Sequence, residues 1–242
     1  MKRAILKAAN ALLGPLGARI VSTKPDAFAM SSALRRIPGH GIPVESVIDI
    51  GASNGKWSLG AMKVFREASV LAIEPLREQD GALAGLKRSH LRFDYALCAA
   101  GEKDGHEVVL NVTEDLDGRT VGSAGGEPRK VPVRTIDAIV AERALRGPFL
   151  LKFDTHGYEV PILKGAKATL RETNVLVMEV YNFRISPHSF TFPEMCTYVE
   201  TLGFRCYDLA DPMLRAHDGA FWQMDLLFCR SRSKIFSYPH YR

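Results

Sequence analysis

The feature that most constrains the fold is a short apolar strand that runs into a turn of small residues. Val47, Ile48 and Ile50 form the strand with Asp49 among them, and Gly51–Gly55 forms the turn. An amphipathic helix is expected next, over 56–66. Glycine lets the backbone approach a ligand closely, and a helix points its first N–H groups at whatever lies above the turn. The stretch therefore predicts a ligand site, with an ordinary first strand of an α/β domain as the alternative.

The residues around the turn also indicate the kind of ligand. A second apolar strand ends in Glu74, at a distance that suits a bond from an acid to ribose hydroxyls. The turn lacks the middle glycine of a dinucleotide-binding turn, and the chain has no phosphate-loop lysine pattern. Asp49 suits a cationic ligand better than a phosphate. S-adenosylmethionine fits, because it has a sulfonium, an amino acid end and a ribose but no phosphate.

Strands and helices then alternate, which predicts an α/β fold with a mostly parallel sheet and helices on both faces. This alternation of strands and helices is interrupted over 101–134, where two strands flank a long loop, 113–128. We expect a β-extension whose tip folds over the site, with a solvated surface hairpin as the alternative. The expected strands are 47–50, 69–73, 91–97, 107–112, 129–134, 149–153, 175–180, 204–209 and 224–229. The expected helices are 2–13, 26–36, 56–66, 77–88, 135–144, 159–169 and 193–202.

Composition limits the partners. The 242 residues are 46% apolar and 24% charged, as in a soluble globular protein. The net charge of +5 is small and scattered, so we expect no nucleic acid partner. The four cysteines have neither metal-binding nor redox spacing, which predicts buried thiols in a reducing, cytoplasmic compartment.

The first residues are basic and amphipathic. No apolar run reaches the ~18 residues that span a bilayer, and Gly14-Pro15 interrupts any signal peptide. Two interpretations of residues 2–13 stay open: peripheral contact with an anionic membrane, or packing on the chain's own domain. We expect an N-terminal helical segment (1–43), one catalytic domain (44–231) and a tail (232–242). The sequence predicts no oligomeric state.

Carboxylates recur at the ends of the predicted parallel strands: Glu74, Asp154, and Glu179 with Asn182 nearby. Charged groups are costly to bury unless they are paired or liganded, so the repetition favours one shared site at the carboxyl edge of the sheet. Asp154 and Glu179 are conceivable metal ligands, but no cluster in the sequence demands an ion, and we expect none.

Two longer stretches carry a family resemblance. Asp49–Gly55 (Asp-Ile-Gly-Ala-Ser-Asn-Gly) is similar to motif I of class I methyltransferases. Leu151–Glu159 (Leu-Lys-Phe-Asp-Thr-His-Gly-Tyr-Glu), followed by Ile162–Ala166 (Ile-Leu-Lys-Gly-Ala), resembles the signature of the FkbM family. Val133–Asp137 is similar to the family's preceding segment. The resemblance covers about residues 45–230.

This resemblance implies a Rossmann-like sheet of seven strands whose last strand is antiparallel. It implies O-methyl transfer from S-adenosylmethionine, commonly to a sugar or polyketide hydroxyl. Gly51, Ser53 and Asn54 would lie near the amino acid end of the cofactor and Glu74 at its ribose. The adenine would lie near Asp94, Tyr95 and Ala96. With their neighbours, the predicted cofactor-binding residues are Asp49, Gly51, Ala52, Ser53, Asn54, Gly55, Glu74, Pro75, Asp94, Tyr95, Ala96 and Asp154.

Methyl transfer to a hydroxyl needs a positioned oxygen and a base for its proton. Asp154 is the first candidate, as the base or as the group that holds the hydroxyl. His156 is the second, because imidazole titrates near neutrality; an exposed turn histidine is the alternative. Predicted substrate-binding residues are Glu179, Asn182, Arg184 and His188. The acceptor would be a glycan or other small molecule, selected by loops 113–128, 181–193 and 210–223.

Two other functions stay open. An NAD-dependent oxidoreductase would need a glycine near position 53 and a residue that handles a hydride. A methyltransferase-like fold can also serve as a binding module without activity.

Overall fold

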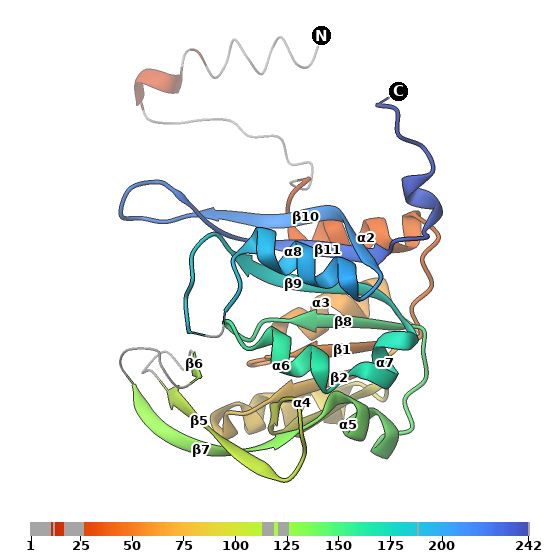
Figure 1. Cartoon of the computed structure of the whole chain (residues 1–242), viewed down its shortest axis with the longest axis vertical. Coiled ribbons are helices and arrows are strands. Elements are labelled where there is room, and N and C mark those ends of the chain that lie inside the picture. The colour runs from red at the N-terminus through yellow and green to blue at the C-terminus, as the bar shows by residue number, and fades with distance from the viewer. Residues whose placement is uncertain are drawn as a thin grey trace.

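The computed structural model describes residues 11, 13–16, 27–112, 119–120, 126–187 and 189–241. Nearly all of the expected helix over 2–13 lies outside these residues, as does most of loop 113–128. A central sheet is covered by helices on both faces, and a smaller sheet lies beside one edge (Figure 1). Among the described residues, no helix has the length and hydropathy needed to cross a bilayer.

The central sheet has seven strands. Their order is β10 (Phe204–Leu214), β11 (Phe221–Arg230), β9 (Thr173–Tyr181), β8 (Phe149–Phe153), β1 (Ser46–Ile50), β2 (Ser69–Glu74) and β3 (Phe93–Leu97). The last strand, β11, is antiparallel to both of its neighbours, and the other pairs are parallel. The Rossmann-like prediction is confirmed. Its central strands are continuous apolar runs because both faces are buried.

Alternation along the strands divides the core into two layers. In β1, Ile48 and Ile50 face one layer and Val47 faces the other. The first layer is covered by α5 (Ile136–Glu142), α6 (Glu159–Lys164), α7 (Lys167–Arg171) and α8 (Phe192–Thr201). The second layer is covered by α2 (Met30–Gly39), α3 (Lys56–Val64) and α4 (Asp80–Ser89). Short 3-10 helices lie at Gly14–Leu16 (η1), Arg77–Gln79 (η2) and Lys234–Phe236 (η3).

The predicted β-extension is present as a second sheet. Its order is β4 (Ala99–Ala100), β7 (Glu127–Arg134), β5 (His106–Val112) and β6 (Arg119–Thr120). A small apolar core joins Leu110 and Val131 of this sheet to Leu76, which follows β2. Arg129 also pairs with Glu78 at 2.5 Å. The extension is therefore docked against the end of β2.

Several expected elements differ in their bounds, and three of the expected segments differ most. The helix expected over 26–36 begins at Met30, where the carboxylate of Asp211 accepts the backbone N–H at 3.2 Å. The helix expected over 159–169 is split at Gly165, whose added Cβ would lie 2.0 Å from the carbonyl oxygen of Gly101. Much of loop 210–223 is strand, because β10 and β11 extend through their hairpin to Leu214 and from Phe221.

Candidate active site

The turn after β1 is packed against the end of β8. Gly51, Ser53 and Gly55 all have left-handed backbone angles. A side chain at Gly51 would place its Cβ 2.0 Å from the carbonyl oxygen of Asp154, so glycine is required there. Ser53 adopts φ 47° without being glycine, a conformation that costs energy and is often found at functional sites.

Glu74 ends β2 and is held by backbone donors. Its Oε2 accepts the N–H of Ser53 at 2.7 Å, and its Oε1 accepts the N–H of Leu76 at 2.9 Å. The residue is 4% exposed, and burial raises its pKa against the effect of these two bonds. Each carboxylate oxygen retains a further lone pair, which can accept a hydroxyl.

A buried ionic triad links the first and second halves of the site. β1 and β8 pair in parallel with Asp49 opposite Lys152, so the two side chains lie together. The Lys152 ammonium lies 3.3 Å from Asp49 Oδ1 and 2.9 Å from Asp154 Oδ2. Burial opposes the charge on Lys152, but the two carboxylates outweigh it and raise its pKa. Asp49 also accepts the hydroxyl of Ser58 at 2.7 Å, while its burial raises its pKa.

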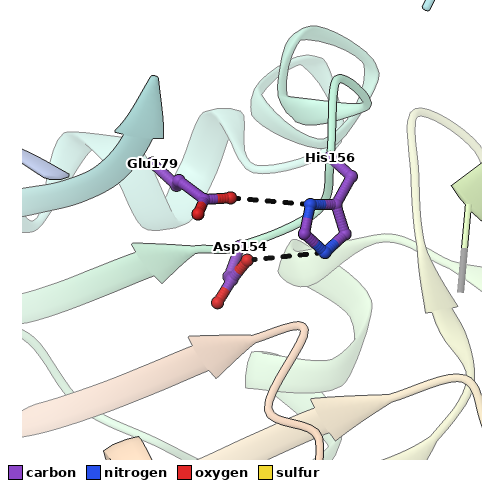
Figure 2. Close-up of side chains that lie close together, drawn as sticks. All are labelled: Asp154, His156 and Glu179. Carbon is purple, nitrogen blue, oxygen red and sulfur yellow. Dashed lines mark ion pairs between the residues drawn. The ribbon is translucent and has the colours of Figure 1, made fainter. Parts of the chain in front are cut away.

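Asp154, His156 and Glu179 converge at the carboxyl edge of β8 and β9 (Figure 2). The imidazole lies between the carboxylates, with Nε2 at 3.8 Å from Asp154 Oδ1 and Nδ1 at 3.5 Å from Glu179 Oε2. The hydroxyl of Tyr181 lies 2.8 Å from Nδ1 and also donates to Glu179. Gln223, from β11, donates to the other oxygen of Glu179.

The two carboxyl groups of this cluster differ in charge. Burial, and then the negative charge of Asp154, raises the pKa of Glu179 to about 8. Burial would also raise the pKa of Asp154, but Lys152 outweighs it and holds that pKa below its usual range. Asp154 is therefore ionised near neutral pH, and Glu179 holds a proton.

The turn that carries His156 is held in place by the carboxylate of Glu159. His156 has φ 49°, and Gly157 has φ 95° with no space for a side chain. Glu159, which is 3% exposed, accepts the Gly157 N–H at 2.9 Å and the Thr155 hydroxyl at 3.1 Å. This buried carboxylate fixes the left-handed turn, so His156 is held toward the two acids.

A cavity of about 280 Å³ lies above these groups. Glu74 and Pro75 lie on its wall together with Asp154 and His156. The apolar part of the wall comes from the strand ends and the β-extension. Its residues are Ile50, Ile73, Leu76, Cys98, Ala99, Ala100, Val108, Leu110 and Ile162.

The predicted cofactor residues fall into two groups. Those that line the cavity are Gly51, Ser53, Glu74, Pro75 and Asp154. Asp49, Ala52 and Gly55 are buried beside the turn, and Asn54 is exposed, with its side-chain oxygen on the Lys56 N–H. Asp94 pairs with Lys87 and Arg143, Tyr95 donates to Asp80, and Ala96 packs in the core. None of these seven is among the lining residues; Cys98–Ala100, just beyond β3, are.

The predicted substrate residues are also divided. Glu179 joins the acidic cluster. The Asn182 side chain donates to the carbonyl of Phe221, and Arg184 donates to Ser189 and pairs with Glu194, so both hold loops together. His188 lies outside the described residues.

Three partners in the site were missed from the sequence: Lys152, Tyr181 and Gln223. Lys152 carries a signal, because it interrupts the apolar strand Phe-Leu-Leu-Lys-Phe, and a buried lysine requires an acid. Tyr181 and Gln223 carry no such signal. They are brought to Glu179 by the end of β9 and by its pairing with β11, where Gln223 lies opposite Tyr181.

Comparison with known proteins identifies the family. The sequence profile of the FkbM methyltransferase domain matches residues 49–206, more than half of the chain. The chain belongs to this family. The FkbM-family protein is accordingly an S-adenosylmethionine-dependent methyltransferase. No curated protein matches its sequence.

The FkbM-family protein is similar to several solved structures. One is 1,6-didemethyltoxoflavin-N1-methyltransferase from Burkholderia thailandensis, at 15% identity and TM-score 0.46, over 95% of this chain and 89% of that one. Another is the Methanococcus jannaschii fibrillarin pre-rRNA processing protein, at 11% identity and TM-score 0.49, over 77% and 66%. A third is a putative RNA methyltransferase, PH1948, from Pyrococcus horikoshii, at 14% identity and TM-score 0.44, over 93% and 98%.

The cavity residues fit the family's cofactor. Glu74 offers buried acceptors that suit a ribose diol, and the apolar wall suits a planar base. The end near Gly51 has an ionised carboxylate, Asp154, which suits a sulfonium.

Proposed function

We propose that the FkbM-family protein methylates a hydroxyl group of a sugar, glycan or other small natural product. The observation that carries this proposal is the shared cavity of Glu74 and the Asp154–His156 pair. A group suited to ribose and groups suited to a hydroxyl proton face the same space. S-adenosylmethionine, when bound, supplies an electrophilic methyl group.

The wall of the cavity suggests how the cofactor lies. We propose that Glu74 binds the ribose, that Gly51 and Ser53 lie at the amino acid end, and that Cys98–Ala100 contact the adenine. The last assignment replaces the one on Asp94–Ala96, whose polar side chains are paired elsewhere. Asp49 acts indirectly, because it is fully buried and holds Lys152 in place.

On the acceptor side, Asp154 is the first candidate to hold the hydroxyl or to take its proton. Its carboxylate is ionised and lies on the cavity wall. His156 is the second candidate base, because it lines the cavity and its Nδ1 lies 3.5 Å from Glu179 Oε2. Carboxylates accept hydrogen bonds from neighbouring hydroxyls, so this edge also suits the diols of a sugar ring.

The test is turnover of methyl-labelled S-adenosylmethionine on a panel of sugars, glycans and hydroxylated small molecules. We expect an O-methyl product, and an Asp154→Asn variant should lose about 10²–10⁴ in kcat, the usual contribution of a general base. Glu200→Gln, an exposed carboxylate on α8, is the matched control and should keep full activity. A methyl group found on nitrogen, sulfur or carbon would overturn the proposal, whereas full activity of Asp154→Asn would overturn the role of Asp154 and leave His156 as the candidate base. Calorimetry should detect S-adenosylmethionine binding but no NAD binding.

A further inference from the structure

The cluster of Asp154, His156 and Glu179 has the composition of a cation site. A carboxylate oxygen of each acid and a nitrogen of the imidazole lie within 4.8 Å of one another. Figure 2 shows the imidazole of His156, in the turn after β8, facing one oxygen of Asp154 at the end of β8 and one of Glu179 in β9. Ligands of one octahedral ion at about 2.1 Å lie about 3 Å apart, so side-chain shifts of about 1 Å would close the set.

Each of the three groups is also held from outside by another side chain. Lys152 binds Asp154 Oδ2 at 2.9 Å, while Oδ1 faces the imidazole. Gln223 donates to Glu179, and the Tyr181 hydroxyl lies 2.8 Å from His156 Nδ1. Metal-ligating carboxylates and imidazoles have such outer partners, which fix their orientation. The cluster is thus oriented in advance.

The charges around the cluster favour a cation. Among the described residues, four carboxyl groups lie near one another here, those of Asp49, Asp154, Glu179 and Asp225. Lys152 lies among them and supplies one positive charge. Uncompensated negative charge is costly to bury. A divalent ion bound by Asp154, His156 and Glu179 would offset part of this charge.

We propose that Asp154, His156 and Glu179 bind a divalent cation, Mg²⁺ or Mn²⁺, at the edge of the cavity. Two carboxylates and one imidazole suit these ions, which complete their coordination with water or substrate oxygen. The role we assign to the ion, holding the oxygen of the acceptor hydroxyl, rests on the proposed function. Asp154 and His156 would then act as ligands, and the ion would lower the pKa of the bound hydroxyl, so that its proton passes to water as the oxygen takes the methyl group.

The first test measures binding alone. Protein stripped with EDTA is titrated with MnCl₂ without methyl donor or acceptor, and bound Mn²⁺ is followed by electron paramagnetic resonance. We expect one saturable site per chain, weakened at least tenfold in Glu179→Gln and in His156→Asn. Glu200→Gln should bind like the original protein. Absence of saturable binding, or unchanged binding in both cluster variants of folded protein, would overturn the proposal.

The second test separates this inference from the proposed function. Methyl transfer to a hydroxyl is measured before and after EDTA and after Mn²⁺ is restored. Loss and recovery of at least tenfold in kcat supports the site. Full activity in the stripped protein would overturn the ion's role and leave hydroxyl methylation intact. Saturable Mn²⁺ binding without any hydroxyl methylation supports the ion site and overturns the proposed function instead.

Discussion

Glu74 and Glu179 occupy similar places and are held in different ways. Both lie at the carboxyl ends of strands in the same sheet, and burial raises the pKa of both. Glu74 is held by backbone N–H groups of Ser53 and Leu76. Glu179 is held by side chains, Tyr181 and Gln223, and faces His156. Backbone donors neither titrate nor rotate away, so the Glu74 end suits a constant ligand. The Glu179 end is made of groups that can exchange protons or ligands.

The largest expected effect is on the free energy of unfolding, and it comes from replacing Lys152, the lysine that supports the Glu179 end. Lys152→Met would leave Asp49 and Asp154 buried without their counter-ion, so we expect a loss of about 3–5 kcal/mol in the free energy of unfolding. Urea denaturation measures it. Lys164→Met, at an exposed lysine 3.9 Å from Glu102, is the control and should cost less than about 0.5 kcal/mol. A loss below about 1 kcal/mol for Lys152→Met would show that Asp49 and Asp154 do not depend on Lys152 as their counter-ion.

The next effect concerns the Glu74 end. Glu74→Ala should weaken S-adenosylmethionine binding about 10–100-fold while the fold persists, because a ribose would lose one or two hydrogen bonds to a charged group. Stability should fall by about 1–3 kcal/mol, since the N–H groups of Ser53 and Leu76 lose their acceptor. Calorimetry measures the affinity, and Glu78→Ala, which removes an exposed partner of Arg129, is the control. Unchanged affinity would refute the ribose assignment.

The two glutamates also show what the sequence can and cannot predict. Glu74 was predictable because its partners lie in the turn and immediately after β2, so local patterns contain the whole arrangement. The meeting of Asp154 with Glu179 followed from the rule that parallel strands end at one edge. The residues predicted to lie near the adenine, Asp94–Ala96, are inside β3 and do not line the cavity, whereas Cys98–Ala100, just beyond that strand, do.

The remaining contacts of the site depend on strand register, which the sequence pattern does not specify. Lys152 contacts Asp49 because β1 and β8 pair with those residues opposite each other. Gln223 reaches Glu179 because β11 runs antiparallel beside β9. A shift of one residue in either pairing would turn these side chains to the opposite face. Polar partners from distant strands therefore required the structure.

A third prediction tests the excess of buried carboxyl groups at the Glu179 end by measuring how stability depends on pH. Burial, and then the charge of Asp154, raises the pKa of Asp225 to about 7. The folded protein therefore binds a proton that the unfolded chain releases near pH 4, and stability is lost as pH rises from about 4 to 7. Asp225→Asn removes this loss. A pKa of about 7 in place of about 4 corresponds to about 4 kcal/mol, so we expect the variant to be more stable than the original by about that amount at pH 8 and equal to it at pH 4.

Urea denaturation of both proteins at the two pH values, in EDTA, gives that difference directly. Other titrating groups are shared by the two proteins, so the difference isolates Asp225. Equal stability at pH 8 would mean that Asp225 is ionised without cost, and the excess of buried carboxyl groups would then be smaller than the geometry indicates.

The smallest expected effect comes from changing the side chain of one donor residue at each glutamate, and it tests the comparison most directly. Tyr181→Phe removes the O–H that donates to Glu179, and this bond favours the ionised form, so the pKa of Glu179 should rise above about 8. Ser53→Ala leaves the backbone N–H that donates to Glu74, so the pKa of Glu74 should not move. Carboxyl carbon NMR of ¹³C-labelled glutamate in stripped protein measures both. Stability should change by about 1 kcal/mol or less in each variant. The opposite result would be an unchanged pKa of Glu179 in Tyr181→Phe together with a shifted pKa of Glu74 in Ser53→Ala. It would show that the side-chain donor to Glu179 is dispensable and that the backbone donor to Glu74 depends on the Ser53 side chain. The contrast between the two glutamates would then be wrong.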